Sequence, residues 1–269
     1  MRGLKNAHPP SILALGFFDG IHRGHQKVIG AGYHLSRQRH IPFQIITFYP
    51  HPRNFISSQK KLKYITTYQE KYCLFQKWYP GSEMCFLRFQ NALRHTDPEI
   101  FLHSIQEAFH PVAIFTGENF RFGFRGQGDT QLLRHFFDQQ GVETFIFPSV
   151  HQDNRMISST LIRKQLENGA IELANSFLGY SFCIRGKVVR GNKIGRNLGF
   201  PTANIYPSSR KLLPPYGVYF GTGRINQTFF PALIYTGTKP TVEQDSRRIV
   251  EVHLPERKNI IVGSIGTDE

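Results

Sequence analysis

A short string near the start of the chain combines glycines with two histidines. The string GFFDGIHRGHQ covers residues 16–26 and follows an apolar run, and its histidines, His22 and His25, are three residues apart. Glycines allow a backbone to approach a ligand closely, and the amide groups at the start of a helix attract phosphate. Because an open parallel sheet binds ligands beyond the carboxyl ends of its strands, we interpret the string as a phosphate site between a strand and a helix. The residues assigned to it are Gly16, Asp19, Gly20, His22, Gly24 and His25.

Two other interpretations of this string stay open. One is a tight strand-to-helix turn that carries surface histidines. The other is a metal site built on His22 and His25, for which the sequence marks no third ligand. The glycines match neither the phosphate loop of kinases and GTPases, which needs a lysine, nor the three-glycine turn that binds dinucleotides. The glycines of this string favour a phosphate ligand over a zinc ion.

The chain around this string alternates apolar runs with helical patterns. Asp97 and Asp129 are predicted N-caps of helices that end at Phe109 and before Gly141. Continuous apolar strands that alternate with helices are typical of a parallel sheet covered on both faces. We therefore predict an α/β fold with a doubly wound parallel sheet. Its predicted strands are residues 12–17, 43–48, 84–87, 112–115 and 144–147.

The pattern changes towards the C-terminal third of the chain. Two short helices, at residues 159–168 and 171–178, are predicted because each closes on a glycine. Beyond them lie β-type runs interrupted by glycine and proline, which predict a small antiparallel β-barrel. We therefore predict a first domain at residues 1–180 and a second at 181–269. The β-type runs are residues 182–189, 217–222, 229–235 and 249–254.

The composition limits the class of protein. The 269 residues are 40% hydrophobic and 19% charged, which excludes a disordered chain. The three cysteines have no paired spacing, so we expect neither a disulfide framework nor a zinc knuckle. No apolar run reaches the ~20 residues that a membrane helix needs, and we expect a protein of the cytoplasm. The net charge of +14 favours a polyanionic partner, which leaves nucleotides, nucleic acids and acidic membranes open.

Four strings together carry a resemblance to a known family. GFFDGIHRGHQ resembles the HxGH signature of nucleotidylyltransferases. Three further strings are similar to the next conserved strings of one branch: TFYPHPRNF at residues 47–55, TGENFRFG at 116–123 and ISSTLIR at 157–163. All four occur in the family's order, so the chain resembles the bacterial bifunctional riboflavin kinase/FMN adenylyltransferases, the prokaryotic FAD synthetases. The resemblance implies a nucleotidylyltransferase domain that transfers AMP from ATP to FMN and releases pyrophosphate.

The resemblance also implies roles for residues of these strings. His22 and His25 would hold the ATP phosphates, where an imidazole hydrogen bond strengthens as charge builds on the α-phosphate. The serine-rich start of a helix would hold the leaving pyrophosphate with hydroxyls, amides and a guanidinium. Asn119 and His51 would contact the reacting phosphates or the flavin phosphate; the alternatives are an ordinary turn residue and an ordinary loop residue. The serine-rich group consists of Ser158, Ser159, Thr160 and Arg163.

A second set of strings is similar to the riboflavin kinase half of this family. The longest is GKVVRGNKIGRNLGFPTANI, residues 186–205. By resemblance, Thr202 and Asn204 bind Mg²⁺ and the ATP phosphates, and Gly195 and Gly199 allow a close backbone approach. Mg²⁺ takes few protein ligands where a nucleotide supplies the negative charge, so two neutral oxygen donors suffice.

The end of the kinase-like region has one implied catalytic residue and two departures from the family. Glu251, in the string VEVHL, matches the base that accepts the proton of the riboflavin 5′-hydroxyl; the alternative is an outward position in an alternating strand. The departures are Tyr235, where the family usually has asparagine, and the stretch after residue 254, which does not resemble the family's final strand and long helix. We therefore expect detectable but poor riboflavin kinase activity.

Two other functions stay in competition with this one. The first is an HxGH nucleotidylyltransferase that acts on another phosphate ester. The kinase-like strings argue against it, because a region that produces FMN makes FMN the simplest acceptor of AMP. The second is a basic nucleic-acid-binding protein, against which we note that the sequence shows no RNA-binding signature. We expect ATP, FMN and riboflavin as small-molecule partners and Mg²⁺ as the cofactor, with neither nucleic acid nor a membrane as a partner.

Overall fold

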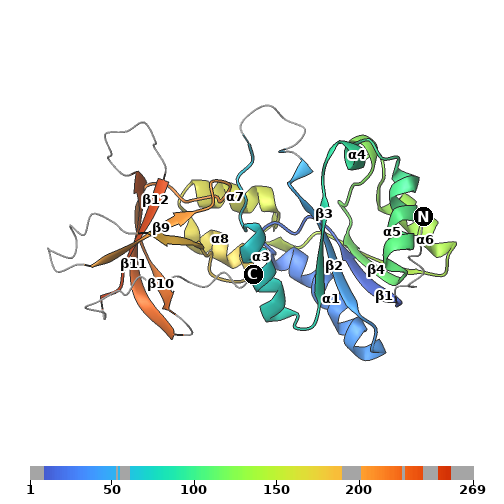
Figure 1. Ribbon diagram of the computed structural model, residues 1–269, viewed down its shortest axis with the longest axis horizontal. Helices are drawn as coiled ribbons and strands as arrows, with labels where there is room; N and C mark the ends of the chain where they lie inside the picture. Colours follow the sequence, from blue (N-terminus) through green and yellow to red (C-terminus); the bar gives the residue numbers. More distant parts are fainter. Residues whose placement is uncertain are drawn as a thin grey trace, which may run out of the picture. The chain divides into compact units, whose positions relative to one another are not determined.

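The computed structural model describes residues 9–52, 54, 61–189, 201–225, 228–238 and 248–255. The predicted positions Gly195 and Gly199 lie outside these residues. The chain divides into two compact units, which are described separately (Figure 1). The first unit contains Met1–Ile162 and Phe177–Gly179, and the second contains Arg163–Ser176 and Tyr180–Glu269.

The first unit is built on a parallel sheet of five strands. The strand order is β3-β2-β1-β4-β5, and every neighbouring pair is parallel. The predicted α/β fold is thus confirmed. The strand order reverses between β1 and β4, and such a switch point is where doubly wound sheets bind ligands. The strands are β1 (Ser11–Leu15), β2 (Phe43–Tyr49), β3 (Glu83–Arg88), β4 (Pro111–Gly117) and β5 (Glu143–Phe147).

Helices connect these strands. The predicted N-caps Asp97 and Asp129 are confirmed, since each side chain accepts hydrogen bonds from the backbone of its helix. Helix α3 falls outside the sequence-based predictions, although Thr67 and Glu70 form a capping box that marks its start. The helices are α1 (Arg23–Arg39), α3 (Tyr68–Trp78), α4 (Asn91–Arg94), α5 (Pro98–Phe109) and α6 (Thr130–Asp138), with the short 3-10 turn η1 (Phe124–Gly126).

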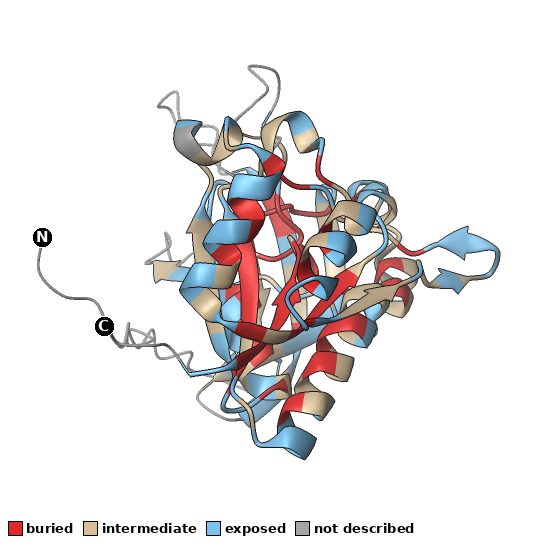
Figure 2. Cartoon of the chain, turned by 90° about the vertical axis from the view of Figure 1, so that its right-hand side faces the viewer, coloured by how far each residue is buried: buried red, intermediate tan, exposed pale blue. Residues whose placement is uncertain are grey.

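Alternate side chains of the sheet enter two hydrophobic cores. Ile12 and Ala14 of β1 belong to the core that includes residues of α1 and α3. Leu13 and Leu15, which point to the other face, belong to the core that includes residues of α5 and α6. Figure 2 shows buried strands between helices whose outer sides are exposed. Burial on both faces explains why these strands are continuous apolar runs in the sequence.

Two glycines of α1 form a matched pair for testing this packing. A Cβ atom added at Gly32 would lie 2.6 Å from the ring of Phe43, whereas one added at Gly30 would meet nothing within 4 Å. We expect Gly32→Ala to lower the free energy of unfolding by about 1–3 kcal/mol through overpacking. We expect Gly30→Ala to raise it by about 0.5–1 kcal/mol because alanine favours a helix. Urea unfolding followed by the fluorescence of Trp78, the single tryptophan, measures both; equal effects would contradict this packing.

The first strand ends two residues before its predicted boundary. β1 stops at Leu15, and the prediction extended it to Phe17. The carbonyl oxygen of Phe17 accepts a hydrogen bond from Oγ1 of Thr47, at 2.8 Å, in place of a strand partner. Phe18 then adopts a left-handed backbone with a φ of 51°. The chain therefore leaves the sheet here and turns towards α1.

The second unit contains an antiparallel sheet of five strands in the order β10-β11-β12-β9-β8. The antiparallel arrangement confirms the prediction. No pairing within the described residues joins β8 to β10, so closure into a barrel stays a prediction. Strand β9, which begins at Thr202 of PTAN, was missed, and the run predicted from residue 182 becomes a strand only at Gly186. The strands are β8 (Gly186–Val189), β9 (Thr202–Pro207), β10 (Gly217–Ile225), β11 (Thr228–Thr238) and β12 (Arg248–His253).

Two helices and a hairpin complete the described chain. Helices α7 (Ser159–Glu167) and α8 (Ile171–Leu178) agree with their predicted bounds to within one residue. Gly169 and Gly179, which follow them, both have a φ of 78°, a left-handed conformation that ends a helix readily only with glycine. The hairpin of β6 (His151–Gln152) and β7 (Arg155–Met156) falls outside the predictions.

Candidate active site

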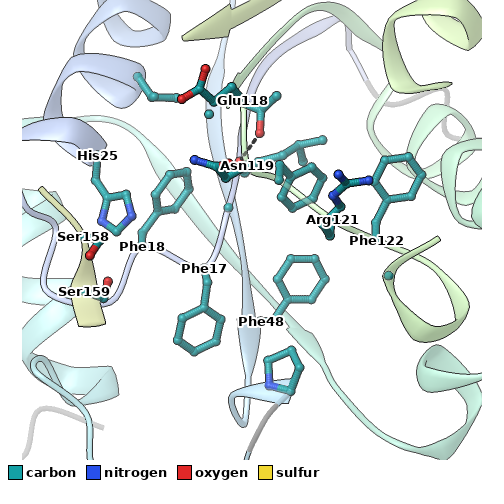
Figure 3. Close-up of a pocket in the computed structure, with 18 of the residues that line it drawn as sticks. Phe17, Phe18, His25, Phe48, Glu118, Asn119, Arg121, Phe122, Ser158 and Ser159 are labelled. Atoms are coloured by element: carbon teal, nitrogen blue, oxygen red, sulfur yellow. Dashed lines mark hydrogen bonds between the residues drawn. The ribbon is translucent and has the colours of Figure 1, made fainter. Parts of the chain in front are cut away.

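A cavity of about 1090 Å³ opens in the first unit. Residues that follow the carboxyl ends of β1, β2, β4 and β5 line it, which is the location expected at the switch point of a doubly wound sheet. Figure 3 shows His25, Ser158 and Ser159 at one side of this cavity and Arg121 and Phe122 at the opposite side. The predicted residues that line it are Gly16, His22, Gly24, His25, His51, Asn119, Ser158 and Ser159.

The remaining predicted residues lie elsewhere in the described chain. Asp19, Gly20 and Thr160 belong to the first unit but do not line the cavity. Arg163 lies in α7, is buried, and falls in the second unit. The three predicted kinase residues, Thr202, Asn204 and Glu251, are also in the second unit.

His22 and His25 are held together at the start of α1. His22 is the N-cap residue, and its Nδ1 accepts a hydrogen bond from the backbone N–H of His25 at 3.4 Å. The two rings stack with centroids 3.6 Å apart. This contact leaves Nε2 of a neutral His22 to carry the proton, so the ring is a donor on that side.

The imidazole of His25 is kept neutral. Burial lowers the pKa of His25 well below its usual value, and the nearby His22 and Lys71 lower it further. Nδ1 of His25 is buried and makes no hydrogen bond to the described residues. A neutral imidazole has one N–H donor and one acceptor, and an unsatisfied buried polar atom commonly marks a functional position.

The turn that carries these histidines is fixed from three directions. The carboxylate of Asp19 accepts hydrogen bonds from the backbone N–H groups of Ile65 and Thr66, at 3.2 and 3.0 Å. The side chain of Gln26 donates from Nε2 to the carbonyl oxygens of Ile21 and Leu178, both at 2.7 Å. Asp19 is thus engaged with the protein itself rather than facing the cavity.

The same turn contains strained backbone. Ile21 has a φ of 35°, a conformation that is costly for a β-branched residue, and Phe18 and Gly20 have φ values of 51° and 79°. A Cβ atom at Gly16 would lie 2.6 Å from the ring of Phe18. Such strain persists only where the surroundings enforce it, and it is concentrated at functional sites in proteins.

A hydrogen-bonded group of side chains follows the carboxyl end of β4, and only one of its members was predicted from the sequence. Nδ2 of Asn119 donates to Oγ of Ser149 at 3.0 Å, and that hydroxyl donates to Glu118 at 2.6 Å. The hydrogen bonds from the side chain and backbone of Ser149 lower the pKa of Glu118. Asn119 was predicted, whereas Ser149, 30 residues further along, carries no signal in the sequence.

The N-terminus of α7 meets the cavity through two serines. Oγ of Ser158 accepts from the backbone N–H of Leu161 at 3.2 Å, which caps the helix. Oγ of Ser159 donates to the backbone carbonyl of Asp19 at 2.9 Å, which joins this helix to the histidine turn. A helix N-terminus carries a partial positive charge that attracts an anion.

Aromatic and cationic side chains form the rest of the lining. Phe48 and Phe120 stack at 6.4 Å, Phe120 and Phe122 stack at 5.6 Å, and the ring of Phe17 lies 3.9 Å from that of His51. The arginines in the lining are Arg94, Arg121 and Arg125. Such a surface suits a planar aromatic ligand with a negative charge. The high phenylalanine content was the only sign of it in the sequence.

In the second unit, strand register brings the predicted kinase residues together. Glu251 of β12 is directly opposite Asn204 of β9, and His253 is opposite Thr202. Residues two apart in a strand share a face, so all four lie on one face of the sheet. Tyr235 of β11 is opposite Glu251 on its other side.

The donor set on this face fits Mg²⁺ bound together with a nucleotide. Thr202 and Asn204 offer neutral oxygen atoms, and Mg²⁺ that bridges phosphates needs few protein ligands. The described residues contain no group of three or more histidine, cysteine, aspartate or glutamate side chains able to hold a metal ion. In those same residues no helix is both long and apolar enough to cross a membrane.

Comparison with known proteins agrees with this arrangement of domains. A family model described as FAD synthetase matches residues 4–161, and one described as riboflavin kinase matches residues 178–265. The fold and the site thus define a nucleotidyltransferase α/β domain followed by a β domain of the riboflavin kinase type.

Curated relatives cover most of the chain. The "Bifunctional riboflavin kinase/FMN adenylyltransferase" of Bacillus subtilis (strain 168) is 31% identical over 97% of this chain and 83% of its own length. The proteins of the same name from Listeria monocytogenes and Escherichia coli (strain K12) are both 32% identical, and the matches cover 80% and 77% of their lengths. The chain therefore belongs to the bifunctional riboflavin kinase/FMN adenylyltransferase family, and the resemblance found in the sequence is confirmed.

A solved structure supports the fold over nearly the whole chain. The crystal structure described as a macrolide-efflux protein from Streptococcus pneumoniae aligns with a TM-score of 0.77 and 26% identity. The alignment covers 98% of this chain and 90% of the other.

Proposed function

We propose that the protein makes FAD in two steps. The second unit phosphorylates riboflavin to FMN with ATP, and the first unit transfers AMP from ATP to FMN with release of pyrophosphate. Family membership supports both reactions. The observation that carries the adenylyl transfer is the cavity of the first unit, which combines two imidazoles and a helix N-terminus with an aromatic lining. These are the surfaces that a triphosphate and a flavin need. We assign residues 1–180 to adenylyl transfer and 181–269 to the kinase.

The adenylyl transfer needs no protein nucleophile. A phosphate oxygen of FMN attacks the α-phosphorus of ATP, the bond from that phosphorus to the bridging oxygen breaks, and pyrophosphate leaves with the bond electrons. Charge builds on the oxygens of the α-phosphate as this occurs. His22 and His25 donate N–H hydrogen bonds that strengthen with this charge, which is how preorganised donors lower a barrier. A neutral His25 still carries one N–H group, so it can donate such a hydrogen bond without a charge of its own in the buried site.

Other residues hold the two ends of the reacting pair. Ser158 and Ser159, at the start of α7, bind the leaving pyrophosphate through hydroxyls and amides. The same role for Thr160 and Arg163 stays a prediction, because Thr160 does not line the cavity and Arg163 falls in the second unit. Asn119 and His51 contact the phosphate of FMN. The phenylalanines around Phe48 receive the isoalloxazine ring. Asp19 and Gly20 act through the backbone of the turn, which they help to hold.

The kinase reaction uses the face shared by β9 and β12. Glu251 takes the proton of the riboflavin 5′-hydroxyl, whose oxygen attacks the γ-phosphorus of ATP while ADP leaves. Asn204 and Thr202 hold the ATP phosphates and would also hold Mg²⁺. When bound, Mg²⁺ neutralises negative charge on those phosphates. The riboflavin kinase model matches as far as residue 265, beyond the point at which the sequence was expected to depart from the family. The expected poor kinase activity stays a prediction, because residues 256–269 lie outside the described chain.

A single assay tests both reactions. Purified protein is incubated with ATP, Mg²⁺ and either FMN or riboflavin, and the flavins are separated by chromatography. We expect FAD from FMN, and FMN followed by FAD from riboflavin, with no product when ATP is left out. FMN recovered unchanged would overturn the adenylyl transfer. FAD formed from FMN but no product from riboflavin would overturn only the kinase.

Substrates and products of this kind fit a cytoplasmic location.

A further inference from the structure

Lys71 is a buried cation that the reaction described above does not use. It lies in α3 with 4% of its surface exposed. Burial lowers the pKa of Lys71 to about 8, although the carboxylate of Asp19 counteracts this effect. A buried ammonium group is costly, and an apolar side chain of the same length would fill the space without that cost. The charge therefore calls for a reason other than packing.

The ammonium group of Lys71 contacts one residue twice. Nζ donates to the backbone carbonyl of Phe17 at 2.7 Å and lies 4.7 Å from the centre of the Phe17 ring. It also lies 3.4 Å from Oγ1 of Thr47, which donates to the same carbonyl. Lys71 thus holds both the backbone and the ring of Phe17.

Phe17 belongs both to the aromatic lining of the cavity and to the turn that carries His22 and His25. Its ring lines the cavity and lies against His51, with centroids 3.9 Å apart. Its backbone begins the turn that leads through Phe18 to the stacked histidines. In Figure 3 the ring of Phe17 lies near that of Phe48 below the histidine side. A group that fixes Phe17 therefore positions both the aromatic lining of the cavity and the start of the histidine turn.

We propose that Lys71 is a positioning residue for adenylyl transfer: its ammonium group fixes Phe17, which holds the aromatic wall against the flavin and the histidine turn in place. This role rests on the proposed formation of FAD. Lys71 touches neither substrate and acts through Phe17. Its charge also adds to the lowering of the pKa of His25, after the larger effects of burial and of His22.

The test uses Lys71→Met, which keeps the length of the side chain and removes the charge. Thr47 still donates to the Phe17 carbonyl, and the buried carboxylate of Asp19 keeps the hydrogen bonds from the backbone N–H groups of Ile65 and Thr66. We therefore expect Lys71→Met to fold with a stability equal to or above that of the wild type, as followed by Trp78 fluorescence in urea. We expect kcat/KM for FMN to fall by about 10- to 100-fold, mainly through KM.

Two further variants separate positioning from a structural effect. Lys71→Gln keeps a neutral donor, and we expect it to recover part of the lost kcat/KM. Lys77→Met, in the exposed last turn of the same helix, is the matched control and is expected to match the wild type.

A second measurement follows the effect of the Lys71 charge on the pKa of His25. We expect the pKa of His25, measured by NMR on histidine-labelled protein, to rise in Lys71→Met and in Lys71→Gln, because both variants remove the neighbouring cation. The other titratable groups that face Lys71 are Asp19 and the tyrosines of the neighbouring small pocket; all are unchanged in these variants. The tyrosines are Tyr49, Tyr64 and Tyr68.

The outcomes separate this inference from the proposed function. A folded Lys71→Met protein with wild-type kcat/KM for FMN and an unchanged His25 pKa would overturn the positioning role. Absence of FAD from the wild-type reaction would overturn the proposed function instead. In that case FMN binding, measured by quenching of flavin fluorescence, decides the role of Lys71: weaker binding by Lys71→Met supports it and equal binding overturns it.

Discussion

Replacing His25 with alanine is expected to lower the turnover of FMN to FAD by at least ~10²-fold, the scale of losing one preorganised donor at the transition state. The ring of His25 lines the cavity and stacks on His22 at 3.6 Å, so the substitution removes a donor and the support of its neighbour. The backbone N–H of residue 25 remains, so the N-cap of α1 is retained. The loss should therefore appear in kcat and not in folding.

Initial rates of FAD formation at saturating FMN and ATP measure this effect. His34→Ala is the matched control, because His34 is exposed on the same helix and shares a hydrogen bond with the side chain of Gln38. A folded His25→Ala protein with a rate near that of the wild type would remove His25 from the phosphate role.

The pH dependence of stability follows from the same histidine. The pKa of His25 is well below its ordinary value of 6.5 in the folded protein, so the unfolded chain binds more protons as the pH falls below that value. Because stability falls with falling pH wherever the unfolded state binds more protons, His25 contributes to acid unfolding that begins near pH 6.5. His25→Ala should weaken this contribution.

Replacing Glu251 with glutamine is expected to lower riboflavin phosphorylation by about 10²- to 10⁴-fold, the usual contribution of a general base. Glutamine keeps the shape of the side chain but cannot accept the proton. Glu251 is directly opposite Asn204, so the lost carboxylate belongs to the strand position beside a residue assigned to the ATP phosphates. The formation of FAD from FMN should be unchanged, because the residues that line its cavity all belong to the first unit.

The two activities of one preparation give this experiment an internal reference. The rate of riboflavin loss and the rate of FAD formation from FMN are measured on the same Glu251→Gln protein. Glu172→Gln, at an exposed position in the first turn of α8, controls for the loss of one carboxylate. Equal losses in both reactions would indicate damage to the whole chain, and no loss in either would exclude Glu251 as the base.

Local sequence patterns predicted the parts of the fold that depend on near neighbours. The five parallel strands were visible because burial on both faces makes each a continuous apolar run. The starts of α5 and α6 were visible because Asp97 and Asp129 cap them within three residues. The histidine turn was visible because its glycines and histidines are adjacent in the chain.

Contacts between distant positions could not be predicted in this way. Lys71 reaches the Phe17 carbonyl across 54 residues, and Asp19 reaches Thr66 across 47. Nothing in the spacing of these residues signals such a contact. For the same reason the sequence could nominate Asp19 for a ligand, whereas its carboxylate is engaged by the backbone of residues 65 and 66.

The link between Gln26 and Leu178 has a consequence for how the protein is made. Phe177, Leu178 and Gly179 belong to the first unit although they follow a stretch that belongs to the second. Leu178 is fully buried, and its carbonyl oxygen holds the same Gln26 amide that holds the histidine turn. During synthesis on the ribosome, the first unit therefore stays incomplete after residue 162 has emerged. The hydrogen bond from Gln26, beside the histidine turn, to Leu178 can form only when residue 178 is outside the exit tunnel. By that time part of the second unit has already been translated.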